Sequence, residues 1–370
     1  MVFIIQQILP EYRYQVLKYL PEQNFRILYS TVLKEGSLSS VTPVEDKFVD
    51  VPIIRLGEKY IQNPISKIHS LRPNIIIFTP ELRNFTFWLL LILKPFYRYK
   101  LVSWTHGINN KDFVTGKIGF SSKFRLLMMK LSDLVIIYST ERAKSLRKLI
   151  SKKIITANNT LDTHTLDEVY TKFSKQGMKS VKEELKWAQD SVNFIYVGRL
   201  IAEKEIDKNI LLFKELSKKI ESPCYFHIIG EGPEREKLES QAGSESSNIL
   251  FHGKIVDPNI VGKLLYASDL HLHLGYNGLA VVHSLCFETP IVTQAPNNLH
   301  GPFHSPEFEY LNKKNSIIRK HTDLADQVLF TLKNENVLNN LKKEARKTYL
   351  EDCMAEHFLN TFITLNEEFN

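Results

Sequence analysis

The chain has 370 residues, of which 43% are hydrophobic and 24% charged, a composition that excludes a disordered or fibrous protein. At about 150 residues per domain, this length predicts two large domains. The formal net charge is +7, and residues 91–153 alone hold fourteen basic residues against three acidic ones. Such a region attracts polyanions, for example nucleic acid, anionic lipid or diphosphates, although a solvated basic surface is the alternative.

Membrane-spanning and disulfide-linked classes are not expected. The longest uncharged apolar run, residues 85–93, is about half of the ~18–20 residues that a helix needs to cross a bilayer. The N-terminal segment lacks the basic region and the cleavage site of a secretory signal. Cys224, Cys286 and Cys353 are few, odd in number and widely spaced, so neither a disulfide framework nor a zinc site is indicated. A reducing cytoplasm is the expected location, with Cys286 as a buried apolar residue.

Apolar, β-branched runs alternate with segments of helical period along the chain, which is typical of parallel sheets covered by helices. In the first half we predict strands at 3–5, 26–29, 75–78, 101–104, 134–138 and 154–156, and helices at 11–20 and 117–131. In the second half we predict strands at 193–197, 225–229, 249–251, 270–274 and 290–293, and helices at 208–220, 233–241, 258–266, 280–286 and 324–331.

These elements predict an α/β protein with two doubly wound domains. The polar, mostly charged stretch 162–190 is interpreted as a connection between them. In the final segment, Phe358, Phe362, Leu365 and Phe369 recur at helical spacing, which predicts a packed terminal helix.

The most informative stretch is 193–204, NFIYVGRLIAEK, in which an apolar strand ends at Gly198 and two cations follow, Arg199 and Lys204. Ligands of α/β sheets bind beyond the carboxyl ends of the strands. A glycine there lets the backbone approach, while arginine offers forked donors and lysine a point charge to one diphosphate. The alternative is an ordinary turn with two surface cations.

Three further segments follow in order: HIIGEGPEREKL at 227–238, NILFHGKI at 248–255, and a Gly-rich turn that leads into a helix at 267–292. Together with the strand-GR-x4-K turn, they resemble the GT4 family of retaining glycosyltransferases with the GT-B fold. The first half is compatible, since LPEYR at 9–13 and WTHG at 104–107 are similar to segments of bacterial members.

The resemblance implies two Rossmann-like domains that face each other across a cleft. Residues 1–165 would form the acceptor-side domain, completed by a C-terminal helix, 353–370, that crosses back to it; residues 166–352 would bind the nucleotide sugar. The implied activity is retaining transfer of a sugar from a UDP- or GDP-linked donor to a glycan or lipid-linked acceptor, in bacterial polysaccharide or glycolipid biosynthesis. No Asp-x-Asp pair occurs in the sequence, so we expect no obligatory divalent cation.

The resemblance also assigns roles to residues. Arg199 and Lys204 would stabilise the departing diphosphate, and His106 would position the reacting sugar, unless it is simply a turn histidine. The start of a helix at 278–281 would add backbone N–H groups and the positive end of a helix dipole. The full set of expected donor-binding residues is Gly198, Arg199, Lys204, Gly230, Lys254, Asn277, Gly278, Leu279, Ala280, Val281, His283 and Glu307.

One departure from the family concerns its two glutamates, which lie eight positions apart and correspond here to Gly275 and His283. A neutral histidine donates or accepts one hydrogen bond but lacks two carboxylate oxygens, and glycine has no side chain. Asn277 or Glu307 is the expected substitute. Arg13 is expected to meet an acidic or phosphorylated acceptor, or else to be a helix-surface arginine.

His271 and His273 share one face of a strand, and we expect them to be packed or hydrogen-bonded rather than to bind a metal. In 119–131, the apolar stripe Phe120, Phe124, Leu127, Met128 and Leu131 suits a core, with basic residues off it. With its basic neighbours, this helix suits peripheral contact with anionic lipid; a core helix with a basic outer face is the alternative.

Two other functions remain open. One is a GT-B epimerase or hydrolase that acts on the nucleotide sugar itself. The other is a non-enzymatic polyanion-binding protein. Nucleic acid is not expected as a partner, because no nucleic-acid motif occurs and the basic region lacks interleaved stacking aromatics.

Overall fold

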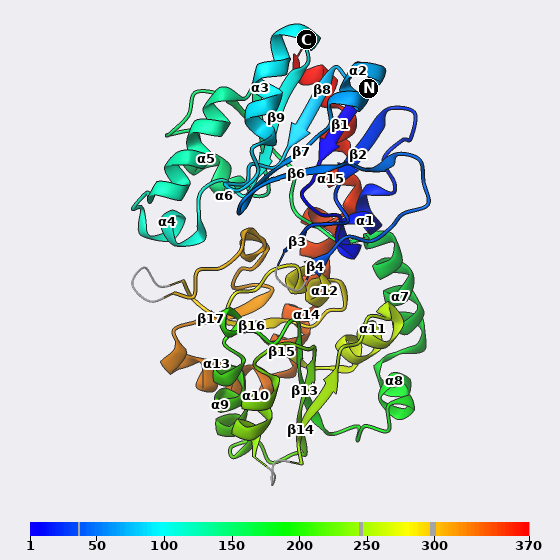
Figure 1. The fold of residues 1–370 in the computed structure, drawn as a ribbon. Helices are drawn as coiled ribbons and strands as arrows, with labels where there is room; N and C mark the ends of the chain where they lie inside the picture. The colour runs from blue at the N-terminus through cyan, green and yellow to red at the C-terminus, as the bar shows by residue number, and fades with distance from the viewer. Residues whose placement is uncertain (36–37, 244–246, 297–300, 370) are drawn as a thin grey trace. The chain divides into compact units, whose positions relative to one another are not determined.

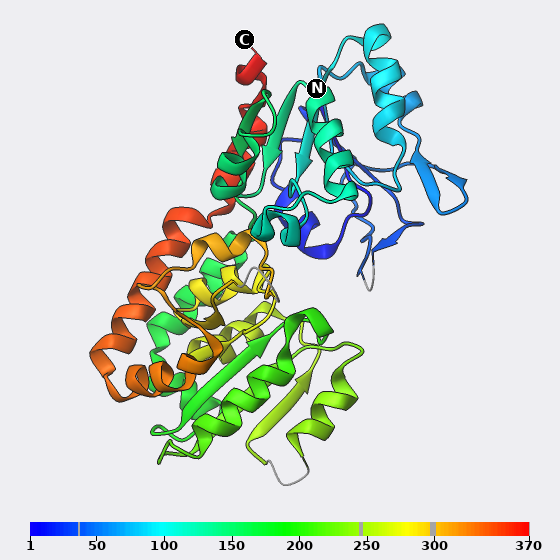
Figure 2. The same cartoon turned by 90° about the vertical axis from the view of Figure 1, so that its left-hand side faces the viewer.

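The computed structural model describes residues 1–35, 38–243, 247–296 and 301–369. The chain divides into two compact units: unit 1 comprises Met1–Asp162 and Ala355–Asn370, and unit 2 comprises Thr163–Met354. The boundaries expected from the sequence, after 165 and before 353, lie three and two residues away. Each unit has a parallel sheet with helices on both faces (Figures 1 and 2), which confirms the α/β prediction.

Unit 1 is built on a seven-stranded parallel sheet of order β11-β10-β9-β8-β1-β2-β5. Its central strands are buried on both faces, and for this reason they read as continuous apolar runs rather than as alternating patterns. Two short antiparallel hairpins, β3–β4 and β6–β7, extend from it. The strands are β1 (Val2–Ile5), β2 (Phe25–Tyr29), β3 (Lys34–Glu35), β4 (Leu38–Ser39), β5 (Phe48–Asp50), β6 (Ile53–Leu56), β7 (Lys59–Gln62), β8 (Ile75–Phe78), β9 (Lys100–Thr105), β10 (Leu134–Ile137) and β11 (Lys153–Thr156).

Alternate residues of these strands face two different cores. Phe3 and Ile5 pack with residues of α3 and α5, whereas Val2 and Ile4 pack with residues of α1 and α15. The helices of unit 1 are α1 (Glu11–Leu17), α2 (Ile65–Leu71), α3 (Thr86–Tyr97), α4 (Asn110–Thr115), α5 (Phe120–Leu131), α6 (Thr140–Leu146) and α15 (Ala355–Ile363), followed by the 3-10 helix η4 (Leu365–Phe369).

The predicted terminal helix is confirmed, and it belongs to unit 1 although it is the last helix of the chain. Phe358 and Phe362 of α15 are buried, with ring centroids 5.7 and 4.9 Å from that of Trp104 in β9. Leu365 is buried in the same core. Residues of α15 and of the first strands of the chain therefore pack in one hydrophobic core.

Unit 2 is built on a six-stranded parallel sheet of order β14-β13-β12-β15-β16-β17. Its strands are β12 (Val192–Val197), β13 (Cys224–Ile229), β14 (Ile249–Gly253), β15 (Leu270–Leu272), β16 (Ile291–Gln294) and β17 (Ser316–Arg319). Its helices are α7 (Thr163–Gln176), α8 (Met178–Glu184), α9 (Ile206–Ser217), α10 (Arg235–Ala242), α11 (Pro258–Ala267), α12 (Ala280–Cys286), α13 (Leu324–Lys333) and α14 (Glu335–Asp352), with 3-10 helices η1 (Ala202–Lys204), η2 (Pro306–Tyr310) and η3 (His321–Asp323).

The stretch 162–190, interpreted from the sequence as a connection between two domains, belongs to unit 2 from Thr163 onward. It forms α7 and α8, which pack against α11 within unit 2. Leu166, Val169 and Phe173 of α7 are buried, and their spacing places them on one side of the helix while the charges occupy the other. The apolar stripe of α7 is narrow, so the mostly polar composition of the stretch did not indicate a packed helix.

Candidate active site

Two turns at the carboxyl edge of the unit 2 sheet are joined backbone to backbone. Gly198 N donates to Ile229 O at 3.0 Å, and Leu200 N donates to Glu231 O at 2.9 Å. A Cβ atom on Gly230 would lie 1.8 Å from Gly198 O, and one on Gly232 would lie 2.2 Å from Leu200 O. The glycines of the GEGP segment are therefore required by close packing, and this packing fixes the turn that carries Arg199.

The Lys204 ammonium group lies in the interior of this turn. Its side chain comes from η1 and the residue is 7% exposed. Nζ donates to Tyr276 O at 2.6 Å and to Asn277 O at 2.9 Å. Burial lowers the pKa of Lys204 to about 7; Glu307 and Glu203 act against this shift and Arg199 adds to it.

Arg199 is exposed, and its backbone carbonyl accepts a hydrogen bond of 3.1 Å from the Tyr196 hydroxyl. Because its charge lowers the pKa of Lys204, the two cations act on the same region of unit 2. The structure thus brings together the two residues that the sequence paired, one as a solvent-accessible guanidinium and the other as a buried ammonium.

Gly275 leaves no room for a side chain. A Cβ atom there would lie 2.4 Å from both C and O of Lys204 and 2.7 Å from Glu203 O. Tyr276 N donates to that same Glu203 O at 2.9 Å. The backbone of η1 therefore occupies the space into which a carboxylate at position 275 would extend, and this explains why glycine stands there.

The predicted backbone donors of 278–281 are partly used within the chain. Gly278 N donates to Ser305 Oγ at 2.8 Å, and Val281 N donates to Gly278 O at 3.1 Å. The N–H groups of Gly278 and Val281 are therefore used to close the turn, and the expectation that residues 278–281 supply backbone donors to a diphosphate loses these two. It now rests on Leu279 and Ala280, at the start of α12.

Residues 304–307, which the sequence analysis largely missed, pack beside this turn. His304 is buried, its Nε2 donates to Gln294 O at 2.9 Å, and its ring stacks on Phe308 at 4.3 Å. Ser305 holds Gly278 as described. Glu307, which was predicted, is buried in η2 and raises the pKa of Lys204. No recognisable motif marks the HSPE segment, so only packing identifies it.

Asn277 is fully buried, so it is not placed to replace a carboxylate that meets sugar hydroxyls. Its Nδ2 donates to His273 O at 3.0 Å and to Thr293 Oγ1 at 3.3 Å, which fastens the turn to the sheet. His283 is half-buried in α12, and its Nδ1 has no hydrogen-bond partner among the described residues. Burial lowers the pKa of His283 to about 4, so the ring is neutral at pH 7.

His271 and His273 are fully buried and hydrogen-bonded, as expected. His271 Nε2 accepts from Val197 N at 3.3 Å, and its Nδ1 lies 3.0 Å from Ser284 Oγ. His273 Nε2 donates to Tyr276 O at 3.0 Å, the carbonyl that also accepts from Lys204. Across the described ranges, no group of three or more His, Cys, Asp or Glu residues is arranged to hold a metal ion.

Lys254 completes the predicted donor set, and Cys286 was predicted separately as a buried apolar residue. Lys254 is exposed directly after β14, at the same edge of the sheet as Gly230, whose N–H donates to Gly253 O at 2.8 Å. Cys286 is buried as predicted, and its Sγ accepts from Arg346 Nη1 at 3.3 Å.

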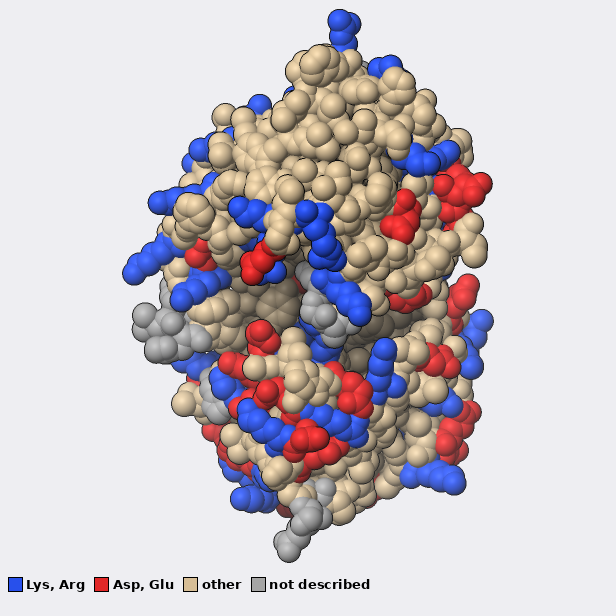
Figure 3. Space-filling model, in the orientation of Figure 1, with Lys and Arg blue, Asp and Glu red and all other residues tan. Residues whose placement is uncertain are grey.

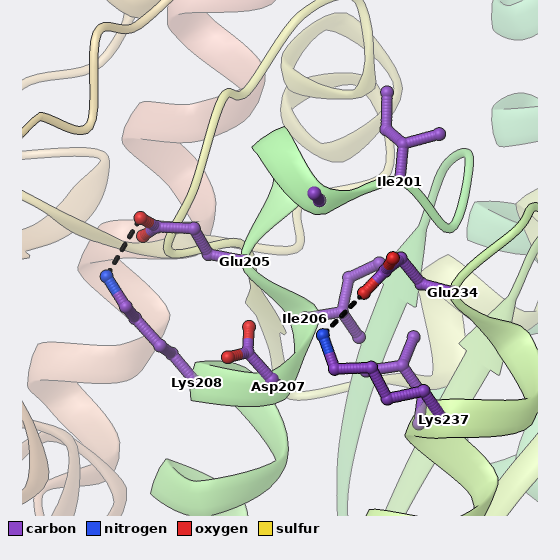
Figure 4. Close-up of a pocket in the computed structure, with 9 residues that line it drawn as sticks. Ile201, Glu205, Ile206, Asp207, Lys208, Glu234 and Lys237 are labelled. Atoms are coloured by element: carbon purple, nitrogen blue, oxygen red, sulfur yellow. Dashed lines mark hydrogen bonds and ion pairs between the residues drawn. The ribbon is translucent and has the colours of Figure 1, made fainter.

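A hollow of about 250 Å³ lies beside the start of α9 (Figure 4). Both of its lysines are paired with neighbouring carboxylates, Lys208 with Glu205 at 2.8 Å and Lys237 with Glu234 at 2.7 Å. These lysines are therefore already neutralised, and the hollow is less suited to a diphosphate than the turn around Lys204. Its lining residues are Ile201, Ala202, Glu205, Ile206, Asp207, Lys208, Glu234, Lys237 and Leu238.

In unit 1, His106 follows β9 and is exposed, with its ring stacked on Tyr138 at 4.3 Å. The backbone of this turn is held by Arg142 of α6, which is buried. Arg142 Nη1 donates to His106 O at 3.2 Å and to Ile108 O at 3.3 Å, and Nη2 donates to Asn110 Oδ1 at 2.6 Å. The sequence did not reveal this role, because an arginine within ERAK resembles an ordinary surface charge.

Arg13 is 4% exposed, which fits neither the predicted contact with an acceptor nor a helix-surface arginine. Its guanidinium lies 4.9 Å from the centroid of the Trp104 ring. Nη2 donates to Asn159 Oδ1 at 3.1 Å and to the Tyr138 hydroxyl at 3.4 Å. Arg13 therefore ties α1 to the core of unit 1.

Comparison with known proteins finds a family that matches the part of the chain that contains Lys204. The family described as glycosyl transferases group 1 matches residues 178–348, a little under half of the chain. All of the matched residues lie within unit 2. An uncharacterized glycosyltransferase of Methanocaldococcus jannaschii is 20% identical over 268 residues, which are 70% of this chain and 65% of that protein.

A second relative, the poly(ribitol-phosphate) alpha-N-acetylglucosaminyltransferase of Staphylococcus aureus, is 22% identical over 276 residues, which are 72% of this chain and 50% of that protein. The chain thus spans between half and two thirds of the length of these relatives. Among solved structures, the Anabaena protein HepE in complex with UDP-glucose is 14% identical with a TM-score of 0.67, over 99% of both chains. This likeness shows the two-domain α/β fold that the sequence predicted.

Proposed function

We propose that the chain is a retaining glycosyltransferase that uses a nucleotide sugar, with UDP as the first nucleotide to test. The observation that carries this proposal is the pair of cations at the end of β12. The buried Lys204 ammonium and the accessible Arg199 act on one region, next to the Gly275–Gly278 turn and the start of α12. This constellation falls within the part of the chain that matches the family.

In the proposed reaction, the bond between the anomeric carbon and the diphosphate oxygen breaks, and the electron pair leaves with the diphosphate. Arg199 and Lys204 stabilise this developing charge, because preorganised donors act most strongly where charge appears in the transition state. The acceptor hydroxyl bonds to the anomeric carbon on the face that the diphosphate left, and its proton passes to a diphosphate oxygen. His106 is assigned to positioning the sugar by the family resemblance.

The donor side requires little help from a metal ion in this proposal, because two protein cations are assigned to the leaving group. We therefore expect activity to persist in the presence of a chelator such as EDTA. For the acceptor we propose a glycan or lipid-linked molecule of a bacterial surface polysaccharide or glycolipid. The S. aureus relative, named for transfer to poly(ribitol-phosphate), supports this class.

The decisive experiment incubates the protein with UDP- and GDP-sugars, with and without candidate glycan acceptors, and follows products by NMR. We expect donor consumption that depends on an acceptor, with the anomeric configuration of the donor kept in the product. Rapid consumption of the donor alone would favour a hydrolase or an epimerase. Inversion at the anomeric carbon would overturn the retaining assignment.

A further inference from the structure

Helix α5 places apolar side chains on its outer side. The sequence assigned Phe120, Leu127 and Leu131 to the core, but the structure exposes all three, and Phe120 is 86% exposed. The core contacts are made instead by Leu126, Met128 and Met129, which are buried, together with the half-buried Phe124. The helix therefore carries apolar residues on both sides.

Helix α3, next to α5, shows the same feature. Ile92 is 66% exposed and Phe96 is 74% exposed, while Phe87 and Leu90 are buried. The two helices are neighbours, since the rings of Trp88 in α3 and Phe124 in α5 lie 5.7 Å apart.

Both helices join neighbouring strands of the parallel sheet, β8 to β9 and β9 to β10, in the same direction across it. Right-handed crossovers that progress in one direction place their helices on one face of a sheet. The outer sides of α3 and α5 therefore face the same way, and together they form what we call the outer face: Ile92, Phe96, Phe120, Leu127 and Leu131.

The charge of the outer face has one sign. Neither α3 nor α5 contains an acidic residue, and Lys123 and Lys130 are exposed on α5, on the same side as Phe120 and Leu127. Arg98 is exposed directly after α3. In the part of Figure 3 where Figure 1 places these helices, Lys and Arg side chains stand out from an otherwise uncharged surface.

We propose that the outer face docks unit 1 on the surface of an anionic lipid bilayer. Large apolar side chains interleaved with lysines are suited to this role, because the apolar groups enter the acyl boundary while the cations meet lipid phosphates. Among the described residues no helix is long and apolar enough to cross a membrane, and docking of this kind needs none. Charge complementarity favours lipid over a second copy, since two copies of this surface would bring lysines together.

The proposal is independent of the transferase activity and is tested on the full chain. Binding is measured by cosedimentation with vesicles of phosphatidylcholine alone and with vesicles that also contain phosphatidylglycerol, at low and high salt. We expect binding only to the anionic vesicles, weakened by salt. The double variant Lys123→Glu and Lys130→Glu should bind about 30-fold more weakly or worse.

A second variant, Phe96→Ser with Phe120→Ser, should weaken binding at least about tenfold and leave the melting temperature unchanged, because both side chains are exposed. Matched controls in unit 2 are Phe330→Ser, also at an exposed apolar residue, and Lys175→Glu with Lys218→Glu. These should bind like the unaltered chain.

The proposal is overturned if the unaltered chain does not bind anionic vesicles, or if the unit 2 controls lose as much binding as the outer-face variants. It is also overturned if ultracentrifugation shows a dimer that only the Phe96 and Phe120 changes dissociate, without vesicle binding. Transfer to a soluble acceptor should be equal in all these variants, so failure of the docking proposal and failure of the proposed function are distinguishable.

Discussion

The turn after β9 in unit 1 and the turn after β15 in unit 2 share one structural feature with different chemistry. In each, a buried cation donates to two backbone carbonyls: Arg142 to those of residues 106 and 108, and Lys204 to those of residues 276 and 277. The guanidinium of Arg142 is permanently charged, whereas burial lowers the pKa of Lys204 to about 7. The first turn is therefore held by a fixed charge, and the second by a charge that responds to pH and to ligands.

The largest effect on turnover is expected from substitution of Arg199, the exposed cation of unit 2. Arg199→Ala should lower turnover about a hundredfold or more, because one preorganised donor is worth about 3 kcal/mol of transition-state stabilisation. Steady-state kinetics with a nucleotide sugar and an acceptor would measure it. The control is Arg83→Ala, at an exposed arginine of unit 1, and near-normal turnover of the Arg199 variant would refute the assignment.

A carboxylate restored at position 275 should damage the site rather than improve it. Both Gly275→Ala and Gly275→Glu must displace the Lys204 backbone, which lies 2.4 Å from the added Cβ. We expect a loss of about 1–3 kcal/mol in stability and a fall in donor affinity, measured by thermal unfolding and by titration with UDP. Gly119→Ala is the control, because its Cβ would meet only the Asp112 carboxylate at 3.3 Å. Higher activity in the Gly275→Glu variant would show that the turn is not rigid.

In unit 1, Arg142→Met should lower the free energy of unfolding by about 1–3 kcal/mol, because two carbonyls and an amide lose a buried partner. Arg142→Lys should keep only part of the stability, since an ammonium lacks the forked donors that reach the carbonyls and the amide together. Chemical denaturation followed by tryptophan fluorescence would measure the change; Trp104 is buried in the same unit. A fully stable Arg142→Met variant would contradict the fixed-charge description of this turn.

The smallest effect is the pH dependence that separates the two turns. Between about pH 7 and 10.5 the unfolded chain binds a proton at Lys204 that the ligand-free native state lacks, so this residue's contribution to stability rises with pH in that window. A bound diphosphate favours the charged form. Affinity for UDP should therefore fall by up to tenfold per pH unit above pH 7, with proton uptake visible by calorimetry in different buffers. Lys204→Arg should flatten this profile, and an equally steep profile in that variant would exclude Lys204 as its source.

The sequence was sufficient to place the sheets and the two cations. The central strands are buried on both faces, so they stand out as apolar runs, and the carboxyl ends of such strands are where ligand-binding turns lie. The strands β5 and β17, each at an edge of its sheet, were not predicted. Both are short, and in β17 only Ile317 and Ile318 are apolar.

Contacts between distant segments could not be predicted. Arg142 looks like a surface charge in the sequence, and Lys204 was expected to meet a diphosphate. Only the fold shows that each of them also donates to two backbone carbonyls. The side of α5 that faces the core was also ambiguous, since Phe120 and Leu127 on one side are as apolar as Leu126 and Met129 on the other. A side chain at position 275 has no room because the Lys204 backbone lies beside it. These two residues are far apart in the sequence, so no local sequence pattern predicts this contact.

The return of α15 to unit 1 has a consequence for biosynthesis. Residues 1–162 are translated before unit 2, but the helix that covers Trp104 and its neighbours is translated after unit 2. Unit 2 has all of its residues available earlier, so it can finish folding on the ribosome while unit 1 still exposes an apolar sheet face. Ribosome-stalled chains that lack residues 355–370 should accordingly recruit chaperones through unit 1, and chains that include these residues should release them.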